Sequence, residues 1–273
     1  MTVAAVILAA GEGTRLRPLT SIRPKALCPV GNVPLLDHAL SRVAGLRLPV
    51  AVNACYLAEQ VVAHVDGRAF VSVEPGSPWG TAGGVARLRG WIAGRGVLVG
   101  NADAYLRSDL PPGADIAALL DGWTGDTVRV LGVPGGREFG DHRFAGFSLL
   151  PWDVVAALPV ERGELVHLAW RPAERAGRLE VVPYPGIYLD TGTPAAYLAA
   201  NLDLAAGGTL VAAGATVTGP VCRAVIGAGA TVAGEVSDAV VWPGGVVAAG
   251  ERLARAVRVG TEMTVPADTM KQL

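Results

Sequence analysis

A glycine-containing loop near the N-terminus carries residue types that are suited to binding phosphate. An apolar stretch from Val3 to Leu8 runs directly into Gly11, Gly13 and Arg15. Glycine has no Cβ, so a backbone of this kind turns sharply and approaches a ligand closely. Backbone N–H groups in such a turn bind anions, and an arginine fork matches phosphate oxygens. We therefore expect a phosphate-binding loop at the end of a first β-strand.

Further along the chain, two acidic residues follow apolar segments. Asp103 comes just after an expected buried strand, and Asp190 precedes Thr193-Pro194, an expected helix start. Carboxylates are ligands that Mg²⁺ prefers, although the same residue types also cap turns and helices. Lys25 adds a second cation to Arg15. Cations, and carboxylates that hold a metal, are residue types that position phosphate groups and neutralise their charge.

The loop matches neither of two common phosphate motifs. A dinucleotide-binding G-x-G-x-x-G would need glycine where Leu16 stands, and no Lys-Ser or Lys-Thr is present for a Walker loop. The string LAAGEGTRLRPLT, followed by Pro24-Lys25, instead resembles the signature of the sugar-1-phosphate nucleotidyltransferases, the NDP-sugar pyrophosphorylases. The later segments EPGSPWGTAGG and YLDTGTP resemble the same family, with Tyr188 in place of its tryptophan.

This resemblance implies an enzyme that converts an NTP and a sugar-1-phosphate to an NDP-sugar and pyrophosphate. It implies that Arg15 binds the leaving phosphates, that Lys25 binds the α-phosphate and the sugar phosphate, and that both are catalytic. Asp103 and Asp190 would hold Mg²⁺. The implied nucleotide-binding residues are Leu8, Ala9, Ala10, Gly11, Gly13, Thr14, Arg15, Gly80, Thr81 and Ala82.

The sugar site departs from the family pattern, because residues 128–147 lack its E-K-P segment. The trimmed insert resembles the short MurNAc-1-phosphate uridylyltransferase branch. Gly146 and Arg143 are the candidate sugar-binding residues, and Arg143 is alternatively a solvated surface arginine. The G-T-A-G loop favours GTP with mannose-1-phosphate or a related sugar phosphate. Uridylyl or thymidylyl transfer, or a non-catalytic nucleotide-sugar-binding subunit of the same fold, are the alternatives.

Alternating strands and helices must position these residues. Strands are expected over 3–8, 50–53, 70–73, 96–99 and 127–133, and helices over 34–44, 57–65, 82–89 and 115–120. This alternation predicts an α/β fold with a doubly wound, mostly parallel sheet. The sheet is Rossmann-like, and the resemblance implies the nucleotide-diphospho-sugar transferase type.

Beyond Gly208 the sequence becomes repetitive and rich in Gly, Ala and Val. Four similar segments begin at Thr209, Ala224, Ala239 and Ala256, which gives offsets of 15, 15 and 17 residues. A short period of this kind predicts a β-solenoid, and the segments resemble the hexapeptide repeats of a short left-handed β-helix. We expect a catalytic domain over 1–206 and a β-helix domain over 207–273. All four histidines precede the repeats, which argues against an acyltransferase and favours self-association into a homo-oligomer.

The composition limits the possible partners. The 273 residues are 51% hydrophobic and 17% charged, with a net charge of −1, so neither nucleic acid nor an anionic membrane is an expected partner. The three cysteines are far apart, odd in number and without metal-ligand spacing, so we expect small buried thiols in a reducing compartment. The apolar start is too short to span a bilayer. We expect a cytoplasmic enzyme with NTP and sugar-1-phosphate as its substrates.

Overall fold

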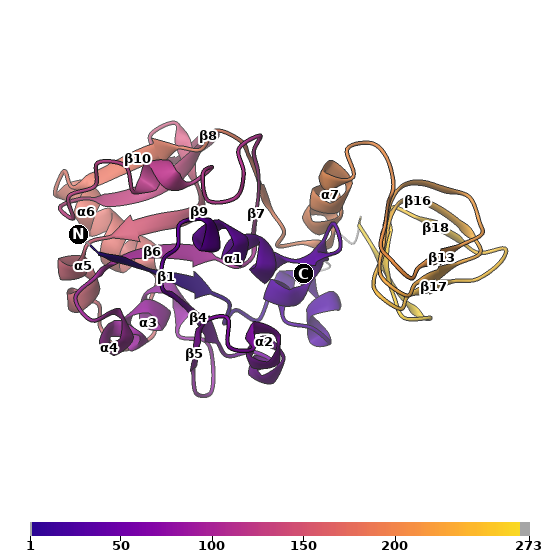
Figure 1. The fold of residues 1–273 in the computed structure, drawn as a ribbon, viewed down its shortest axis with the longest axis horizontal. Coiled ribbons are helices and arrows are strands. Elements are labelled where there is room, and N and C mark those ends of the chain that lie inside the picture. The colour runs from indigo at the N-terminus through magenta and orange to yellow at the C-terminus, as the bar shows by residue number, and fades with distance from the viewer. Residues whose placement is uncertain (1, 268–273) are drawn as a thin grey trace. The chain divides into compact units, whose positions relative to one another are not determined.

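The computed structural model describes residues 2–267 and divides into two compact units. The first unit comprises Met1–Glu12, Pro24–Ala26 and Leu36–Tyr188, and the second comprises Gly13–Arg23, Leu27–Leu35 and Leu189–Leu273. Each unit therefore contains segments that are far apart in the sequence. Figure 1 labels helices and strands of the chain. Arg15 belongs to the second unit and Lys25 to the first.

The first unit is built on a seven-stranded sheet with the order β10-β8-β9-β6-β1-β4-β5. Its strands are β1 (Val3–Leu8), β4 (Val50–Ala54), β5 (Phe70–Val73), β6 (Gly96–Asn101), β8 (Val128–Phe139), β9 (His142–Leu150) and β10 (Leu179–Pro183). β1 pairs in parallel with both β4 and β6, whereas β9 runs antiparallel to β6 and β8. The predicted mostly parallel sheet is confirmed, with one reversed strand that the sequence analysis did not expect.

Helices pack against this sheet. They are α1 (Leu35–Gly45), α2 (Ala58–Val65), α3 (Gly80–Arg87), α4 (Arg89–Ile92), α5 (Trp152–Ala157) and α6 (Arg171–Arg175), with a 3₁₀ turn η4 (Ala117–Leu119) and a π-helical turn η5 (Val166–Trp170). The helix predicted over 115–120 is wrong except for η4. Asp115 accepts a hydrogen bond from the Gly113 N–H at 2.9 Å and pairs with Arg42 at 2.8 Å. Its side chain thus stabilises a turn in place of a helix.

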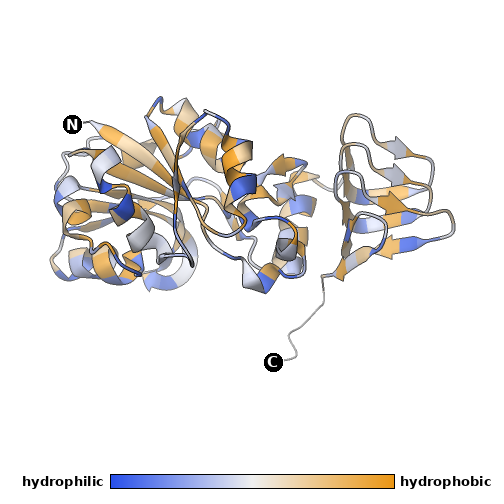
Figure 2. Cartoon of the chain, turned by 90° about the horizontal axis from the view of Figure 1, so that it is seen from below, coloured by the Kyte–Doolittle hydropathy of each residue, from blue (hydrophilic) through white to orange (hydrophobic). Residues whose placement is uncertain are grey.

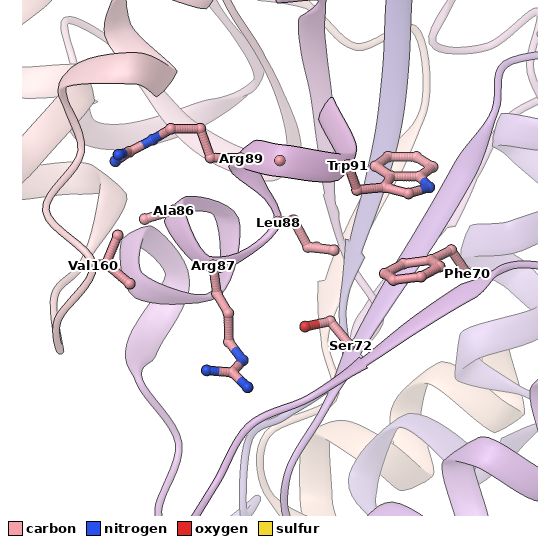
Figure 3. A pocket seen from close by; sticks show the side chains of 9 residues that line it. Phe70, Ser72, Ala86, Arg87, Leu88, Arg89, Trp91 and Val160 are labelled. Atoms are coloured by element: carbon pink, nitrogen blue, oxygen red, sulfur yellow. The ribbon is translucent and has the colours of Figure 1, made fainter. Parts of the chain in front are cut away.

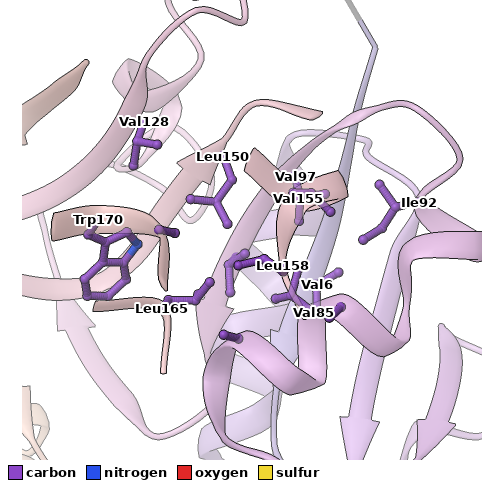
Figure 4. Packing of buried hydrophobic residues seen from close by; sticks show 14 of the residues in the cluster. Val6, Val85, Ile92, Val97, Val128, Leu150, Val155, Leu158, Leu165 and Trp170 are labelled. Carbon is purple, nitrogen blue, oxygen red and sulfur yellow. The ribbon is translucent and has the colours of Figure 1, made fainter. Parts of the chain in front are cut away.

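A continuous apolar core fixes the helices to the sheet. Val6 of β1, Val97 of β6, Val85 of α3 and Val155 of α5 are fully buried in one cluster (Figure 4). Burying one such side chain contributes about 1.5–3 kcal/mol. β1 lies between β4 and β6, so the strand order reverses there. The loops that follow β1 and β6 are therefore at the position where open α/β sheets bind ligands.

The second unit combines parts of the N-terminal segment with the repeats. It contains the 3₁₀ turns η1 (Thr14–Leu16) and η2 (Leu19–Ser21), the hairpin β2 (Pro29–Val30) and β3 (Val33–Pro34), and helix α7 (Pro194–Leu204). The turn η3 (Lys25–Leu27) and the strand β11 (Ile187–Asp190) each contain residues of both units, and β11 forms a two-stranded sheet with β7 (Ala104–Arg107). The predicted helix start is confirmed, because Thr193 Oγ1 accepts the Ala196 N–H at 3.2 Å.

Successive repeats pair strand on strand. Their strands are β12 (Leu210–Val211), β13 (Thr216–Val217), β14 (Val221–Ile226), β15 (Thr231–Val232), β16 (Glu235–Val241), β17 (Val246–Val247), β18 (Arg252–Ala254), β19 (Ala256–Val259) and β20 (Met263–Pro266). Leu210 pairs with Val225, Val225 with Val240, and Val240 with Val257, all in parallel. These are the sequence offsets of 15, 15 and 17 residues. Figure 2 shows hydrophobic residues along these strands, and a buried cluster with Ile226 and Val241 lies beneath them.

Two further expectations concern the molecule as a whole. None of the helices within residues 2–267 is long and apolar enough to cross a membrane. The three cysteines are free, but only Cys28 is buried, while Cys55 is half-buried and Cys222 is exposed.

Candidate functional site

The loop after β1 is the segment in which the sequence predicts phosphate binding, and it turns at Gly13. Gly13 adopts φ 62° and ψ 36°, a left-handed conformation that glycine adopts at no steric cost. A Cβ at Gly11 would meet nothing within 4 Å, so the loop faces open space there. The Ala9 N–H donates to Asn53 Oδ1 at 2.7 Å, and the Ala102 N–H donates to Leu8 O at 3.0 Å. The end of β1 is thus tied to β4 and to the turn after β6.

Lys25 and Asp103 lie together in the first unit. Lys25 Nζ lies 2.7 Å from Asp103 Oδ2 in a charge-assisted hydrogen bond. The Lys25 side chain is 7% exposed, and the Asp103 side chain is 44% exposed. Asp103 occupies the turn between β6 and β7, and no helix follows it, so it is not a helix cap. One oxygen of Asp103 therefore holds the buried ammonium group of Lys25, while the Asp103 side chain remains partly exposed to solvent.

Arg15 and Asp190 lie together in the second unit. Arg15 Nη1 is 3.8 Å from Asp190 Oδ2, with side chains that are 58% and 46% exposed. A Cβ at Gly192 would lie 2.8 Å from Arg15 Nη2 and 2.9 Å from Asp190 Oδ1. Glycine at this position therefore leaves room for the pair. Asp190 does not cap α7, because Thr193 does.

The first turn of α3, which carries the predicted nucleotide-binding residues Gly80, Thr81 and Ala82, is held by residues that the sequence did not reveal. Glu164 Oε2 accepts hydrogen bonds from Thr81 Oγ1 at 2.7 Å and from the Thr81 N–H at 3.2 Å. The Ala82 N–H donates to Gly163 O at 2.9 Å. Gly80 has φ 76°, and a Cβ there would lie 2.4 Å from Gly163 O. The only sequence signal for this contact was an acid in an otherwise unassigned R-G-E-L segment.

A buried acid–amide pair joins the loop after β1 to the segment before α3. Asn53 Nδ2 donates to Glu74 Oε1 at 2.7 Å, and Glu74 Oε2 accepts the Trp79 N–H at 2.8 Å. Asn53 is 2% exposed and Glu74 is 3% exposed. Together with the bond from Ala9, this pair connects two segments of the predicted nucleotide site. One sequence signal could have revealed this pair. Asn53 in β4 and Glu74 directly after β5 are polar residues next to apolar strand residues.

The two candidate sugar-site residues lie on β9. Gly146 has φ 79°, and a Cβ there would lie 2.5 Å from Ala104 Cβ. The Arg143 guanidinium stacks over the Tyr188 ring at 5.1 Å and donates to Tyr188 O at 3.1 Å. Arg143 is exposed, yet this stacking orders it. The aromatic residue that replaces the family's tryptophan therefore has a direct partner.

A pocket of about 410 Å³ lies elsewhere in the first unit, between β5 and the α3–α4 junction (Figure 3). Phe70 stacks on Trp91 with centroids 5.9 Å apart, and Leu88 and Ser72 point into the space. No predicted site residue lines this pocket. The residues that the sequence predicts to bind phosphate or Mg²⁺ are instead in the segments described above.

Comparison with known proteins decides the family. The model of the nucleotidyl transferase family matches residues 4–130. The N-acetylmuramate alpha-1-phosphate uridylyltransferase of Neisseria meningitidis serogroup B is 30% identical over 220 residues, which cover 69% of this chain and 93% of that protein. The chain belongs to the nucleotidyl transferase family. The predicted resemblance and the enzyme class, sugar-1-phosphate nucleotidyltransferase, are confirmed by these matches.

Other relatives of this nucleotidyl transferase chain carry different substrate names. The mannose-1-phosphate guanylyltransferase of Mycobacterium tuberculosis is 29% identical over 240 residues, with 75% of this chain and 65% of that protein covered. A Bacillus anthracis protein assigned as a glucose-1-phosphate thymidylyltransferase superposes with a TM-score of 0.62 at 17% identity. It covers 73% of this chain and 94% of its own, and this likeness shows the fold. Three bases occur among these names, so similarity leaves the base open.

Proposed function

We propose that the chain transfers a nucleotidyl group from an NTP to a sugar-1-phosphate and releases pyrophosphate. The sugar-phosphate oxygen attacks the α-phosphorus in line with the departing pyrophosphate, so the protein needs to position reactants and neutralise charge. The Lys25–Asp103 pair at the end of β6 carries this proposal. It presents a fixed cation and a solvent-accessible carboxylate at the ligand-binding edge of the sheet. Arg15 binds the leaving phosphates, and the loop from Leu8 to Thr14 lines the triphosphate.

The residues also suit the Mg²⁺ that the resemblance implies. Asp103 and Asp190 are carboxylates about half exposed, and carboxylate oxygens are hard ligands that this ion takes. Within residues 2–267 no group of three or more acidic, histidine or cysteine side chains is gathered to hold a metal. Mg²⁺ commonly takes one or two protein carboxylates, with water and substrate phosphates completing its shell. Bound there, it would neutralise charge that develops on the phosphates.

We infer GTP as the nucleotide, with mannose-1-phosphate or a related sugar phosphate as the acceptor. Glu164 supports this choice because its carboxylate lies beside Thr81 in the segment assigned to the base. Guanine presents adjacent N–H donors on its Watson–Crick edge, which a carboxylate accepts well, whereas uracil and thymine present one donor between two carbonyls. The substrate name of the mycobacterial relative agrees. Uridylyl transfer, the activity named for the neisserial relative, is the alternative.

We also propose that residues 1–206 form the catalytic domain and that residues 207–273 form a left-handed β-helix through which copies associate. Parallel pairing at the repeat offsets supports the β-helix. Self-association is supported by Val211 and Val217, which are 51% and 36% exposed on β12 and β13, the strands at the ends of their sheets. Lysine at both positions should lower the oligomeric mass measured by light scattering. An unchanged mass would remove this surface from the proposal.

Pyrophosphate release, measured for each NTP with each of several sugar-1-phosphates, tests the reaction and the base together. We expect GTP with mannose-1-phosphate to give the highest kcat/KM, and a preference for UTP with an amino-sugar phosphate would select the alternative. Asp103→Asn should abolish Mg²⁺-dependent release while its melting temperature stays near that of the native chain. Asp121→Asn, at an exposed acid outside the site, is the matched control. Undiminished release by Asp103→Asn would disprove the metal assignment.

A further inference from the structure

The repeats contact the stretch of chain that follows the phosphate-binding loop. Trp242, in the third repeat, is 1% exposed, and its Nε1 donates to the Tyr197 hydroxyl at 2.9 Å. That hydroxyl donates in turn to Pro29 O in the hairpin β2–β3. All three residues belong to the second unit. A hydrogen-bonded path therefore runs from the repeats through α7 to the N-terminal segment.

A second contact reaches the stretch that carries Arg15. The Arg23 guanidinium lies 4.8 Å from the centroid of the Trp242 ring, a cation–π contact. Arg23 is the last residue of Gly13–Arg23. Gly13, at the other end of this stretch, accepts a hydrogen bond through its carbonyl from Thr20 Oγ1 at 2.9 Å, and Thr20 is fully buried. The stretch around Arg15 is thus closed on itself by Thr20 and attached to the repeats by Arg23.

Two more hydrogen bonds hold the hairpin. The Gly31 N–H donates to Asn201 Oδ1 of α7 at 3.0 Å, and Asn32 Nδ2 donates to Ile226 O of the repeats at 3.1 Å. Asn201 is fully buried. These contacts use helix and repeat residues that have no part in the assigned chemistry.

We propose that Trp242 and Tyr197 are positioning residues: the repeats hold the segment that carries Arg15 and so determine how tightly the enzyme binds the triphosphate. This inference rests on the role given to Arg15 in the proposed function. Tyr197 is suited to the task because burial raises the pKa of its hydroxyl well above the usual value. The hydroxyl stays protonated and continues to donate to Pro29. Removing it leaves a buried carbonyl and a buried indole N–H without their partner.

Three variants test the path at different points. Tyr197→Phe removes the bridging hydroxyl, Trp242→Phe removes the indole N–H, and Arg23→Gln removes the stacked charge without entering the core. Each should raise KM for the NTP about five- to tenfold, through the loss of one or two buried hydrogen bonds in Tyr197→Phe and Trp242→Phe and of the cation–π contact in Arg23→Gln. KM for the sugar-1-phosphate should change less than twofold, and the oligomeric mass should stay constant.

Trp123→Phe is the matched control, because that indole donates to Thr127 O at 2.8 Å in the first unit and should leave both KM values unchanged. If all three variants keep the native KM for the NTP, the repeats do not position this segment and the inference is overturned. Equal rises in both KM values would overturn it too, since they would indicate a general loss of structure.

A double-mutant cycle with Arg15→Ala separates this inference from the proposed function. Once Arg15 is gone, Trp242→Phe should lower kcat/KM no further, because the two residues act through one segment. Additive losses would overturn the positioning role while leaving the role of Arg15 intact. If Arg15→Ala alone has no effect on kcat/KM, the assigned role of Arg15 is wrong, and the inference built on it is wrong as well.

Discussion

The two predicted catalytic cations, only ten residues apart in sequence, are held in opposite ways. Lys25, in the first unit, has a 7% exposed side chain and touches Asp103 at 2.7 Å. Arg15, in the second unit, has a 58% exposed side chain and lies 3.8 Å from Asp190. A buried charge such as that of Lys25 is costly without its partner and so keeps one geometry, whereas exposed pairs contribute about 0–1 kcal/mol and exchange readily with solvent.

The roles proposed for the two cations are consistent with this difference in exposure. A fixed lysine suits the α-phosphate, where the bond is made and small displacements cost rate. A solvent-exposed arginine with a weak partner suits the leaving phosphates, which must enter and depart at each turnover. The same contrast recurs beside α3, where Glu74 is buried and Glu164 is exposed. Buried groups are therefore expected to control rate, and exposed groups to control affinity and selection.

Lys25→Met should give the largest effect. Methionine keeps the length of the buried stem but removes the charge, so we expect kcat to fall about 10³-fold, at the upper end for loss of a charge-stabilising donor. Stability should fall less than the ~3–5 kcal/mol of a broken, fully buried pair, because Asp103 is partly solvated. Pyrophosphate release and thermal melting on the same sample check both. A variant that melts natively and turns over at more than a tenth of the native rate would contradict the role of Lys25.

Arg15→Ala should give the next largest effect, about 10²-fold in kcat/KM, with much of it in KM for the NTP. Arg15→Lys keeps the charge without the fork and should recover part of the loss. The Arg15 side chain is exposed, so salt screens its attraction to the phosphates of the NTP. The KM of the native enzyme for the NTP should therefore rise with ionic strength. Steady-state kinetics at two salt concentrations measures all three. A loss under threefold for Arg15→Ala would refute this role.

The sequence predicted the parts of the site that depend on local motifs. The turn at Gly13 and the helix cap at Thr193 were expected because each depends on neighbouring residues. The repeat offsets also became the strand registers, because a parallel stack requires one period. The left-handed β-helix, the domain boundary and the roles of the site residues remain predictions.

What the sequence did not reveal depends on contacts between distant residues. Asn53 and Glu74 are 21 residues apart, and Thr81 and Glu164 are 83 apart, with no spacing rule to connect them. No strand was predicted where β9 lies, and an apolar run in any case gives no sign of the direction of a strand. The helix expected at Asp115 failed because a buried arginine, Arg42, holds that side chain in a turn.

Glu74→Gln should give an intermediate effect and test whether buried positioning controls rate. The native carboxylate accepts from both Asn53 Nδ2 and the Trp79 N–H, so an amide places a donor against one of these donors. We expect kcat to fall about tenfold, with little change in the ratio of GTP to UTP turnover. Parallel kinetics with both nucleotides measures this. A changed nucleotide ratio with native kcat would mean that Glu74 contacts the base, contrary to the buried position of its carboxylate.

Glu164→Gln should give the smallest effect on rate but change nucleotide selection. Its carboxylate is exposed, and one oxygen, Oε2, accepts both hydrogen bonds from Thr81, so an amide oxygen in that place keeps both and should leave α3 in place. The amide is a poorer acceptor for the adjacent donors of guanine, and it offers a donor to a uracil carbonyl. We expect the ratio of kcat/KM for GTP to that for UTP to fall about three- to tenfold, with kcat for the better nucleotide nearly unchanged. Glu161→Gln, at an exposed acid three residues earlier, should leave the ratio unaltered. If the two variants behave alike, Glu164 only caps α3, and the exposed acid takes no part in choosing the base.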